Sequence, residues 1–135
     1  MSRKRSPETA IQCTVIQHLQ TRAVPGVIYF HTPNGGYRGK TEAAQFKAMG
    51  VLAGVSDLIL FHAGKLYCLE LKAQGGRATE EQMAFIQAME RQGAFTAIAT
   101  GLDRALATLE AWGLLRGSSV KDILRLTAER AETAA

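Results

Sequence analysis

The chain has 135 residues, the usual size of one domain, and is long enough for a hydrophobic core without disulfide or metal staples. Its composition, 47% hydrophobic and 21% charged, is that of a globular protein, and no apolar run approaches the roughly 20 residues that cross a bilayer. A net charge of +4 and a pI near 9.3 lean mildly toward a polyanionic partner.

The N-terminal residues and the cysteines bear on where the protein works. Residues 1–6 form a basic arm, but no apolar segment follows, so the arm lacks the pattern of a secretory signal. Cys13 and Cys68 show neither a metal-binding spacing nor a disulfide framework, which suits a reducing compartment. We therefore expect a cytoplasmic protein without a membrane partner, and the arm suits contacts with phosphate.

Helical and strand patterns alternate along the first half of the chain. Apolar residues recur at helical spacing after Ser6 and Pro7, which suit an N-cap and a first helical position. The later segment HTPNGGYRGK is rich in turn formers. The elements expected here are a helix over 7–22, a buried strand over 27–30, a loop over 31–40 and a short helix over 41–49 that is capped by Thr41 and ends at Gly50.

The second half of the chain predicts a hairpin followed by a crossover. Strands over 56–61 and 66–72 are separated by HAGK, a spacing typical of a hairpin. A helix over 79–92 should then bring a strand over 94–100 back parallel to the second hairpin strand.

The order of the elements defines the fold class. With a last helix from Leu102 to Trp112, the order is αβαββαβα, which predicts an α/β fold with a mixed β-sheet flanked by helices. We expect one domain over 7–117, after the arm over 1–6 and before a C-terminal helix or tail over 118–135.

Two ionisable residues lie within the otherwise apolar strand LYCLELK. Glu70 and Lys72 are two positions apart, so they point to the same face of the sheet. If the hairpin is symmetric about Ala63 and Gly64, Asp57 lies directly opposite Glu70. Two facing carboxylates, with Cβ atoms about 4.5 to 5.5 Å apart, repel each other unless a proton or a cation lies between them.

A divalent cation would remove this repulsion. Oxygen ligands without accompanying cysteine or histidine favour Mg²⁺ or Mn²⁺ over zinc. Lys72 could then hold or deprotonate a water at the metal, or stabilise charge on a phosphate. A structural reading stays open, in which Glu70 and Lys72 form an ion pair at a strand end and Asp57 merely follows a turn. The facing register of two acids on an apolar hairpin favours the metal site.

The segment GVSDLILFHAGKLYCLELKAQGGRATEEQ, residues 54–82, resembles the core of the VRR-NUC (virus-type replication-repair nuclease) domain of the PD-(D/E)xK nuclease superfamily. The match extends upstream through PNGGYRG and FKAMGVLAG, so it runs from Glu8 to about Thr100 with its pieces in the family's order. The resemblance implies a restriction-endonuclease-like fold and Mg²⁺-dependent hydrolysis of DNA phosphodiester bonds, in a bacterial or phage-infected cell, with no small-molecule cofactor.

The resemblance also implies roles for individual residues. Asp57 and Glu70 match the family's metal ligands, the carbonyl of Leu71 completes the metal shell, and Lys72 matches the catalytic lysine. One departure is Ser56, where the family usually has proline. Proline there shapes the entry of the strand and binds no metal, so the departure leaves the expected site unchanged.

Two further residues match the family's site but also have structural explanations. Gln82 matches a glutamine on the helix after the catalytic strand, and it lies three positions after Thr79, as in a capping box. Glu8 matches a first-helix glutamate that joins the metal site, and a carboxylate is also favoured there by the helix dipole. Both roles can hold together for each residue.

Basic and polar residues near the loops are candidates for DNA contacts. Asn34, Arg38 and Lys40 lie in the expected loop over 31–40. Arg77 follows the two glycines after the strand that carries Glu70 and Lys72. The short chain leaves little room for base readout, so we expect recognition of the DNA backbone and shape. The leading hypothesis is a structure-directed DNA endonuclease; a catalytically silent DNA-binding or assembly module, a monomeric flap or nicking nuclease and a sequence-specific nuclease stay open.

Similar stand-alone proteins of the family resemble enzymes that cut four-way (Holliday) junctions in DNA repair as symmetric dimers. Two coordinated nicks need two active centres in matching orientation, so we expect a homodimer. The apolar positions that could form its contact surface are Val15 and Leu19 on the first helix and Val120, Ile123 and Leu124 in the tail. Both stripes could instead belong to the ordinary core.

Overall fold

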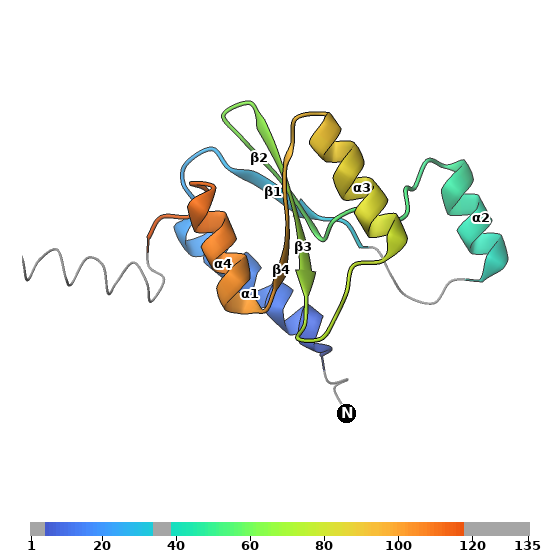
Figure 1. The fold of residues 1–135 in the computed structure, drawn as a ribbon, viewed down its shortest axis with the longest axis horizontal. Coiled ribbons are helices and arrows are strands. Elements are labelled where there is room, and N and C mark those ends of the chain that lie inside the picture. The colour runs from blue at the N-terminus through green and yellow to red at the C-terminus, as the bar shows by residue number, and fades with distance from the viewer. Residues whose placement is uncertain (1–4, 34–38, 118–135) are drawn as a thin grey trace, which may run out of the picture.

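The computed structural model describes residues 5–33 and 39–117 (Figure 1). Its elements follow the predicted order αβαββαβα. The helices and strands are α1 (Pro7–Arg22), β1 (Ile28–His31), α2 (Lys40–Ala48), β2 (Leu58–His62), β3 (Lys65–Lys72), α3 (Glu80–Arg91), β4 (Phe95–Thr100) and α4 (Leu102–Ala111). The predicted tail, with Val120, Ile123 and Leu124, lies outside the described residues, as do Asn34 and Arg38.

The four strands form one mixed sheet in the order β1-β2-β3-β4. The pairs β1–β2 and β2–β3 are antiparallel, and the crossover through α3 returns β4 parallel to β3, as predicted. In the hairpin, Leu58 pairs with Leu69 and His62 with Lys65, which confirms the predicted centre of symmetry. Ala63 and Gly64 both have positive φ, 50° and 76°, as a two-residue hairpin turn of the favoured hand requires.

One face of the sheet carries the main hydrophobic core. Helices α1 and α4 pack against each other and against β3 and β4 (Figure 1). The core under them is formed by residues of β2, β3 and β4, by the inner sides of both helices and by the segment after α4: Val15, Leu19, Leu58, Leu60, Tyr67, Leu69, Leu71, Ala99, Ala105, Leu106, Leu109, Leu114 and Leu115.

Two residues of this core had been expected on a contact surface. Val15 is 0% exposed and Leu19 is 2% exposed, so the prediction that they form a dimer surface is wrong. The reason is geometric: α1 turns its single apolar stripe onto the sheet, where α4 closes over it. Buried Arg22 fixes this arrangement, because its guanidinium donates to Glu110 at 2.8 Å and to the carbonyl of Arg116 at 2.6 Å.

The other face of the sheet is covered only in part. Helix α3 packs against β4 and buries Ile86, whereas Phe30, Phe61 and Ile98 are more than 40% exposed. Side chains alternate along a strand, so the face opposite Leu69 and Leu71 also presents Cys68, Glu70 and Lys72. The candidate active site therefore lies on the α3 side of the sheet.

Helix α2 differs from the prediction at its start. It begins at Lys40 after an extended Gly39, so the expected N-cap Thr41 lies inside the first turn, and no side chain caps the helix. None of its residues is buried, and it stands away from the sheet (Figure 1). Among the described residues, no helix has both the length and the apolar character needed to span a bilayer.

Candidate active site

The hairpin brings Asp57 and Glu70 together. Asp57 directly precedes β2, and continuing the register from the Leu58–Leu69 pair by one residue places Asp57 opposite Glu70. Oδ2 of Asp57 accepts a hydrogen bond of 2.8 Å from the backbone N–H of Leu71. The carboxylate of Asp57 is therefore held by the backbone of the neighbouring strand, beside the carboxyl group of Glu70.

Glu70 is 2% exposed, and its carboxyl group uses only part of its hydrogen-bonding capacity. Its Oε1 accepts a hydrogen bond of 3.0 Å from Nε2 of Gln82 and lies 3.8 Å from Nζ of Lys72. No donor among the described residues reaches its Oε2. Burial, together with the neighbouring Asp57, raises the pKa of Glu70 to about 8, although Lys72 acts in the opposite direction. Without a cation, the pair of acids therefore favours holding a proton.

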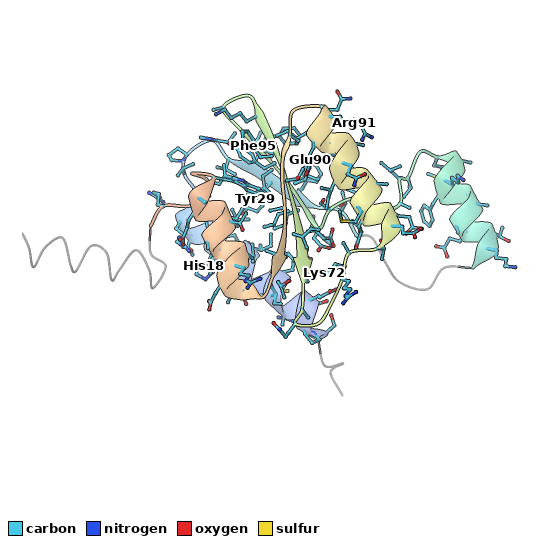
Figure 2. The ribbon with its side chains drawn as sticks, in the orientation of Figure 1. His18, Tyr29, Lys72, Glu90, Arg91 and Phe95 are labelled. Atoms are coloured by element: carbon cyan, nitrogen blue, oxygen red, sulfur yellow. The ribbon has the colours of Figure 1, made fainter. Side chains whose placement is uncertain are left out.

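Lys72 ends β3 on the same face as Glu70. Lys72 is 7% exposed, and Figure 2 shows its side chain at the carboxyl end of β3, near the start of α1. A buried ammonium group needs a negative partner, and Nζ of Lys72 lies 3.8 Å from Oε1 of Glu70, so it faces the pair of acids, which carries negative charge even when it holds one proton. Lys72 is thus placed to act on a group bound at the two carboxylates.

Gln82 joins the start of α3 to this pair. Its side-chain Oε1 accepts a hydrogen bond of 2.9 Å from the backbone N–H of Thr79. The backbone N–H of Gln82 donates to the hydroxyl of Thr79 at 3.2 Å. Because the capping box uses the oxygen of the Gln82 amide, the amide nitrogen is left facing Glu70. The hydrogen bonds of the capping box and the contact with Glu70 are therefore both present, as the sequence allowed, and the role of Gln82 in an active site stays a prediction.

Glu8 lies at the edge of the site, exposed on the first turn of α1. A Cβ atom added to Gly76 would lie 3.5 Å from Oε1 of Glu8 and 3.6 Å from Cδ of Lys72. The loop after β3 therefore passes close to both of these side chains. Glu8 is brought near Lys72, and its expected part in metal binding stays a prediction.

The remaining candidates lie farther from the carboxylate pair. Lys40 is exposed at the start of α2, away from the sheet, and Arg77 is exposed on the loop that follows Gly76. In the described part of the chain, neither forms a hydrogen bond or an ion pair with Asp57 or Glu70. Their proposed contacts with DNA stay predictions.

The donor set fits a hard cation that keeps most of its water. Within the described residues, no three or more histidine, cysteine, aspartate or glutamate side chains form a group that could hold a metal. Asp57 and Glu70 thus offer two carboxylates, and Mg²⁺ is typically bound through one or two carboxylates with water and phosphate as the other ligands. The free Oε2 of Glu70 is available as one such ligand.

Sequence reasoning missed two residues at the end of β1. His31 and Thr32 bind the backbone carbonyls of Asp57 and Ser56, respectively. The sequence carries one signal for this, because Pro33 has no N–H and must end the ladder between β1 and β2.

The mixed sheet, its flanking helices and the acids on its central hairpin define an α/β nuclease-type domain with a restriction-endonuclease-like fold. The family model of the VRR-NUC domain matches residues 6–103, and the chain belongs to this family. The family indicates a nuclease-type function. No curated protein compared with the chain matches it.

Two solved structures are similar to the chain. One, described as a VRR_NUC domain protein, has 26% identity and a TM-score of 0.66, and the similarity covers 81% of this chain and 89% of the other. A second, described as a VRR_NUC domain, has 14% identity and a TM-score of 0.53 over 78% of this chain and 97% of the other. At 14% identity, the second likeness shows the fold alone.

Proposed function

We propose that the protein is a Mg²⁺-dependent, structure-directed DNA endonuclease that hydrolyses phosphodiester bonds in branched DNA such as four-way junctions. The observation that carries this proposal is the pair of facing carboxylates, Asp57 and Glu70, on an otherwise apolar hairpin. A module that only binds DNA has no need for two acids in this register. One oxygen of Glu70 lacks a hydrogen-bond donor, and the pKa of its carboxyl group is raised. Both features support a cation between Asp57 and Glu70.

Each residue of the site has its own proposed role. Asp57 and Glu70 would hold Mg²⁺ or Mn²⁺, with the Leu71 carbonyl and Glu8 as expected further ligands. Bound there, the cation would supply Lewis-acid stabilisation of the phosphate and a more acidic water. Gln82 orients the Glu70 carboxylate through the 3.0 Å hydrogen bond. Lys72 would hold or accept a proton of the attacking water, or stabilise negative charge as it develops on the phosphate.

A DNA substrate that is recognised by its backbone and shape is proposed on two grounds. The net charge of +4 suits a polyanion, and the described part of the chain is occupied by the sheet and the helices that position the site. Recognition by backbone contacts and by DNA shape is then favoured over base readout. Arg77 and Lys40, with Asn34 and Arg38 of the adjoining loop, are the proposed phosphate contacts.

The proposal is tested by cleavage assays on duplex, flap, single-stranded and four-way-junction DNA, with Mg²⁺, with Mn²⁺ and with EDTA. We expect metal-dependent nicks, most rapid on the junction. Asp57→Asn should abolish cleavage and retain DNA binding, because it removes a charge that a hard cation needs. Asp103→Asn, at an exposed position in the first turn of α4, is the matched control and should cleave normally.

Each alternative reading has its own outcome in this assay. Cleavage that continues undiminished in EDTA contradicts the metal site. Junction binding without cleavage under any condition indicates a DNA-binding or assembly module. Preference for a flap over the junction indicates a monomeric flap or nicking nuclease.

A further inference from the structure

The ladder between β1 and β2 stops immediately beside the candidate active site. Its last pair is His31 with Leu58, and continuing the register by two residues would pair Pro33 with Ser56. Proline has no N–H to donate. The backbone carbonyl of Ser56 would therefore receive no N–H from Pro33, directly beside Asp57, which must be held in place.

Two consecutive side chains of the β1 end replace the missing ladder. Nδ1 of His31 lies 2.7 Å from the carbonyl oxygen of Asp57, and Oγ1 of Thr32 donates to the carbonyl oxygen of Ser56 at 2.9 Å. A carbonyl oxygen only accepts, so Nδ1 of His31 must carry the hydrogen. Neither contact depends on core packing, because His31 is exposed and Thr32 is half-buried.

Asp57 is consequently held from two sides. Its carbonyl is bound by His31 from β1, while its carboxylate accepts the N–H of Leu71 from β3. We propose that His31 and Thr32 are positioning residues that fix the backbone of residues 56–57 so that the Asp57 carboxylate faces Glu70. This inference rests on the proposed role of Asp57 as a ligand, and it assigns to β1 a part in building the site.

A competing role for His31, a direct contact with DNA, predicts that a different substitution of His31 retains activity. Nε2 of the exposed ring could contact a DNA phosphate directly, in which case the Nδ1 hydrogen bond would be incidental. Asparagine places an amide nitrogen near the position of Nδ1, whereas glutamine reaches toward the position of Nε2. The two substitutions therefore separate a positioning role from a phosphate contact.

The test compares His31→Ala, His31→Asn and His31→Gln, with Thr32→Val and Thr32→Ser as the pair for the hydroxyl. The first measurement is NMR hydrogen exchange of the Leu71 amide in the protein without metal or DNA. We expect exchange about tenfold faster or more in His31→Ala, His31→Gln and Thr32→Val, since the hydrogen bond from this amide to Oδ2 of Asp57 is weakened. His31→Asn and Thr32→Ser should restore the wild-type rate.

Mg²⁺ affinity by calorimetry and junction cleavage should follow the same order of variants. Equal Leu71 exchange in all five variants overturns the proposal, as does full cleavage by His31→Gln with loss in His31→Asn. The exchange measurement needs neither metal nor substrate. A protein that shows the expected exchange pattern but cleaves no DNA would therefore refute the proposed function and leave the positioning role standing.

Discussion

Glu70 links the stability of the metal-free protein to pH. Its pKa in the folded protein, about 8, lies above the ordinary value of 4.5, because burial and Asp57 disfavour the charged form. Between these two values the folded state binds more protons than the unfolded state, so the free energy of unfolding falls as the pH rises. The contribution of Glu70 is most favourable near and below pH 4.5, and it is lost as the pH rises through about 8.

Chemical denaturation of wild type and Glu70→Gln in EDTA, from pH 5 to 8.5, measures this effect. Glutamine resembles the protonated acid, so Glu70→Gln should become increasingly more stable than wild type across that range. Adding Mg²⁺ should stabilise wild type and have little effect on the variant. A difference between the two proteins that stays constant with pH would show that Glu70 does not titrate as described.

Lys72 separates catalysis from metal binding. Because it is close to Glu70 but carries no ligand atom for a cation, Lys72→Ala should leave Mg²⁺ affinity nearly intact. The single-turnover cleavage rate should fall by roughly 10²- to 10⁴-fold, the range typical of losing a positioned proton-transfer or charge-stabilising group. Lys65→Ala, an exposed lysine at the other end of β3, is the control. Lost metal affinity with an unchanged rate would contradict the role given to Lys72.

At the scale of elements, the loop before β2 fits tightly against α3. Gly54 has a φ of +83°, and a Cβ added there would lie 2.3 Å from the backbone carbonyl oxygen of Glu81. Backbone atoms cannot move aside as a flexible side chain can. The glycine therefore lets the strand that carries Asp57 approach the helix turn that carries Gln82.

Gly54→Ala should displace the first turn of α3 and weaken the hydrogen bond between Gln82 and Glu70. Gly50→Ala is a matched control, because Gly50 has a similar φ of +93° but no atom within 4 Å of the added Cβ. Both variants carry left-handed strain of about 1 to 2 kcal/mol. Gly54→Ala alone should lose further stability in denaturation and lower the cleavage rate. Equal effects of the two substitutions would mean that the close approach is unimportant.

The sequence predicts those parts of the site that depend on local register. The alternation of Glu70 and Lys72 and the two-residue turn at Ala63 and Gly64 sufficed to place Asp57 opposite Glu70. The contacts of His31 and Gly54 could not be predicted, because they depend on how β1 and α3 approach the hairpin in three dimensions. The prediction that Thr41 caps α2 was wrong. A side-chain cap from Thr41 is not needed, because the preceding Gly39 already adopts the extended conformation of an N-cap residue.

The same distinction applies to apolar stripes. The spacing of Val15 and Leu19 correctly marks one face of a helix, but spacing does not say whether that face meets the core or another molecule. The structure assigns both residues to the core. The exposed side chains of Ile28 and Phe30 belong to the strand that the sequence had indicated as buried.

At the scale of the whole molecule, the proposed homodimer needs another surface. Phe30 and Phe61 lie on neighbouring strands with ring centroids 6.3 Å apart, and Ile28 pairs with Phe61 in the register. All three are more than 40% exposed, on the part of the sheet that α3 leaves uncovered. Exposed apolar groups of this kind commonly mark contact surfaces.

Light scattering at several concentrations, with and without junction DNA, should give twice the chain mass of 14.6 kDa. Phe61→Glu should shift the protein toward the monomer, because it would place a charge within the contact. Leu52→Glu, at a 59% exposed position outside the sheet, is the control and should remain dimeric. A mass near 14.6 kDa in every sample would remove the dimer and favour a monomeric nuclease.

The strand order β1-β2-β3-β4, identical to the order along the chain, has a consequence for folding. Asp57 and Glu70 meet when a single short hairpin closes, a step with a small loss of chain entropy that takes about 1 to 10 μs in isolated hairpins. The parallel strand β4 requires the longer crossover through α3. The two acids are therefore brought together by a fast and local step, whereas the pairing of β3 with β4, which completes the sheet beside Glu70, can follow only after the slower closure of the crossover.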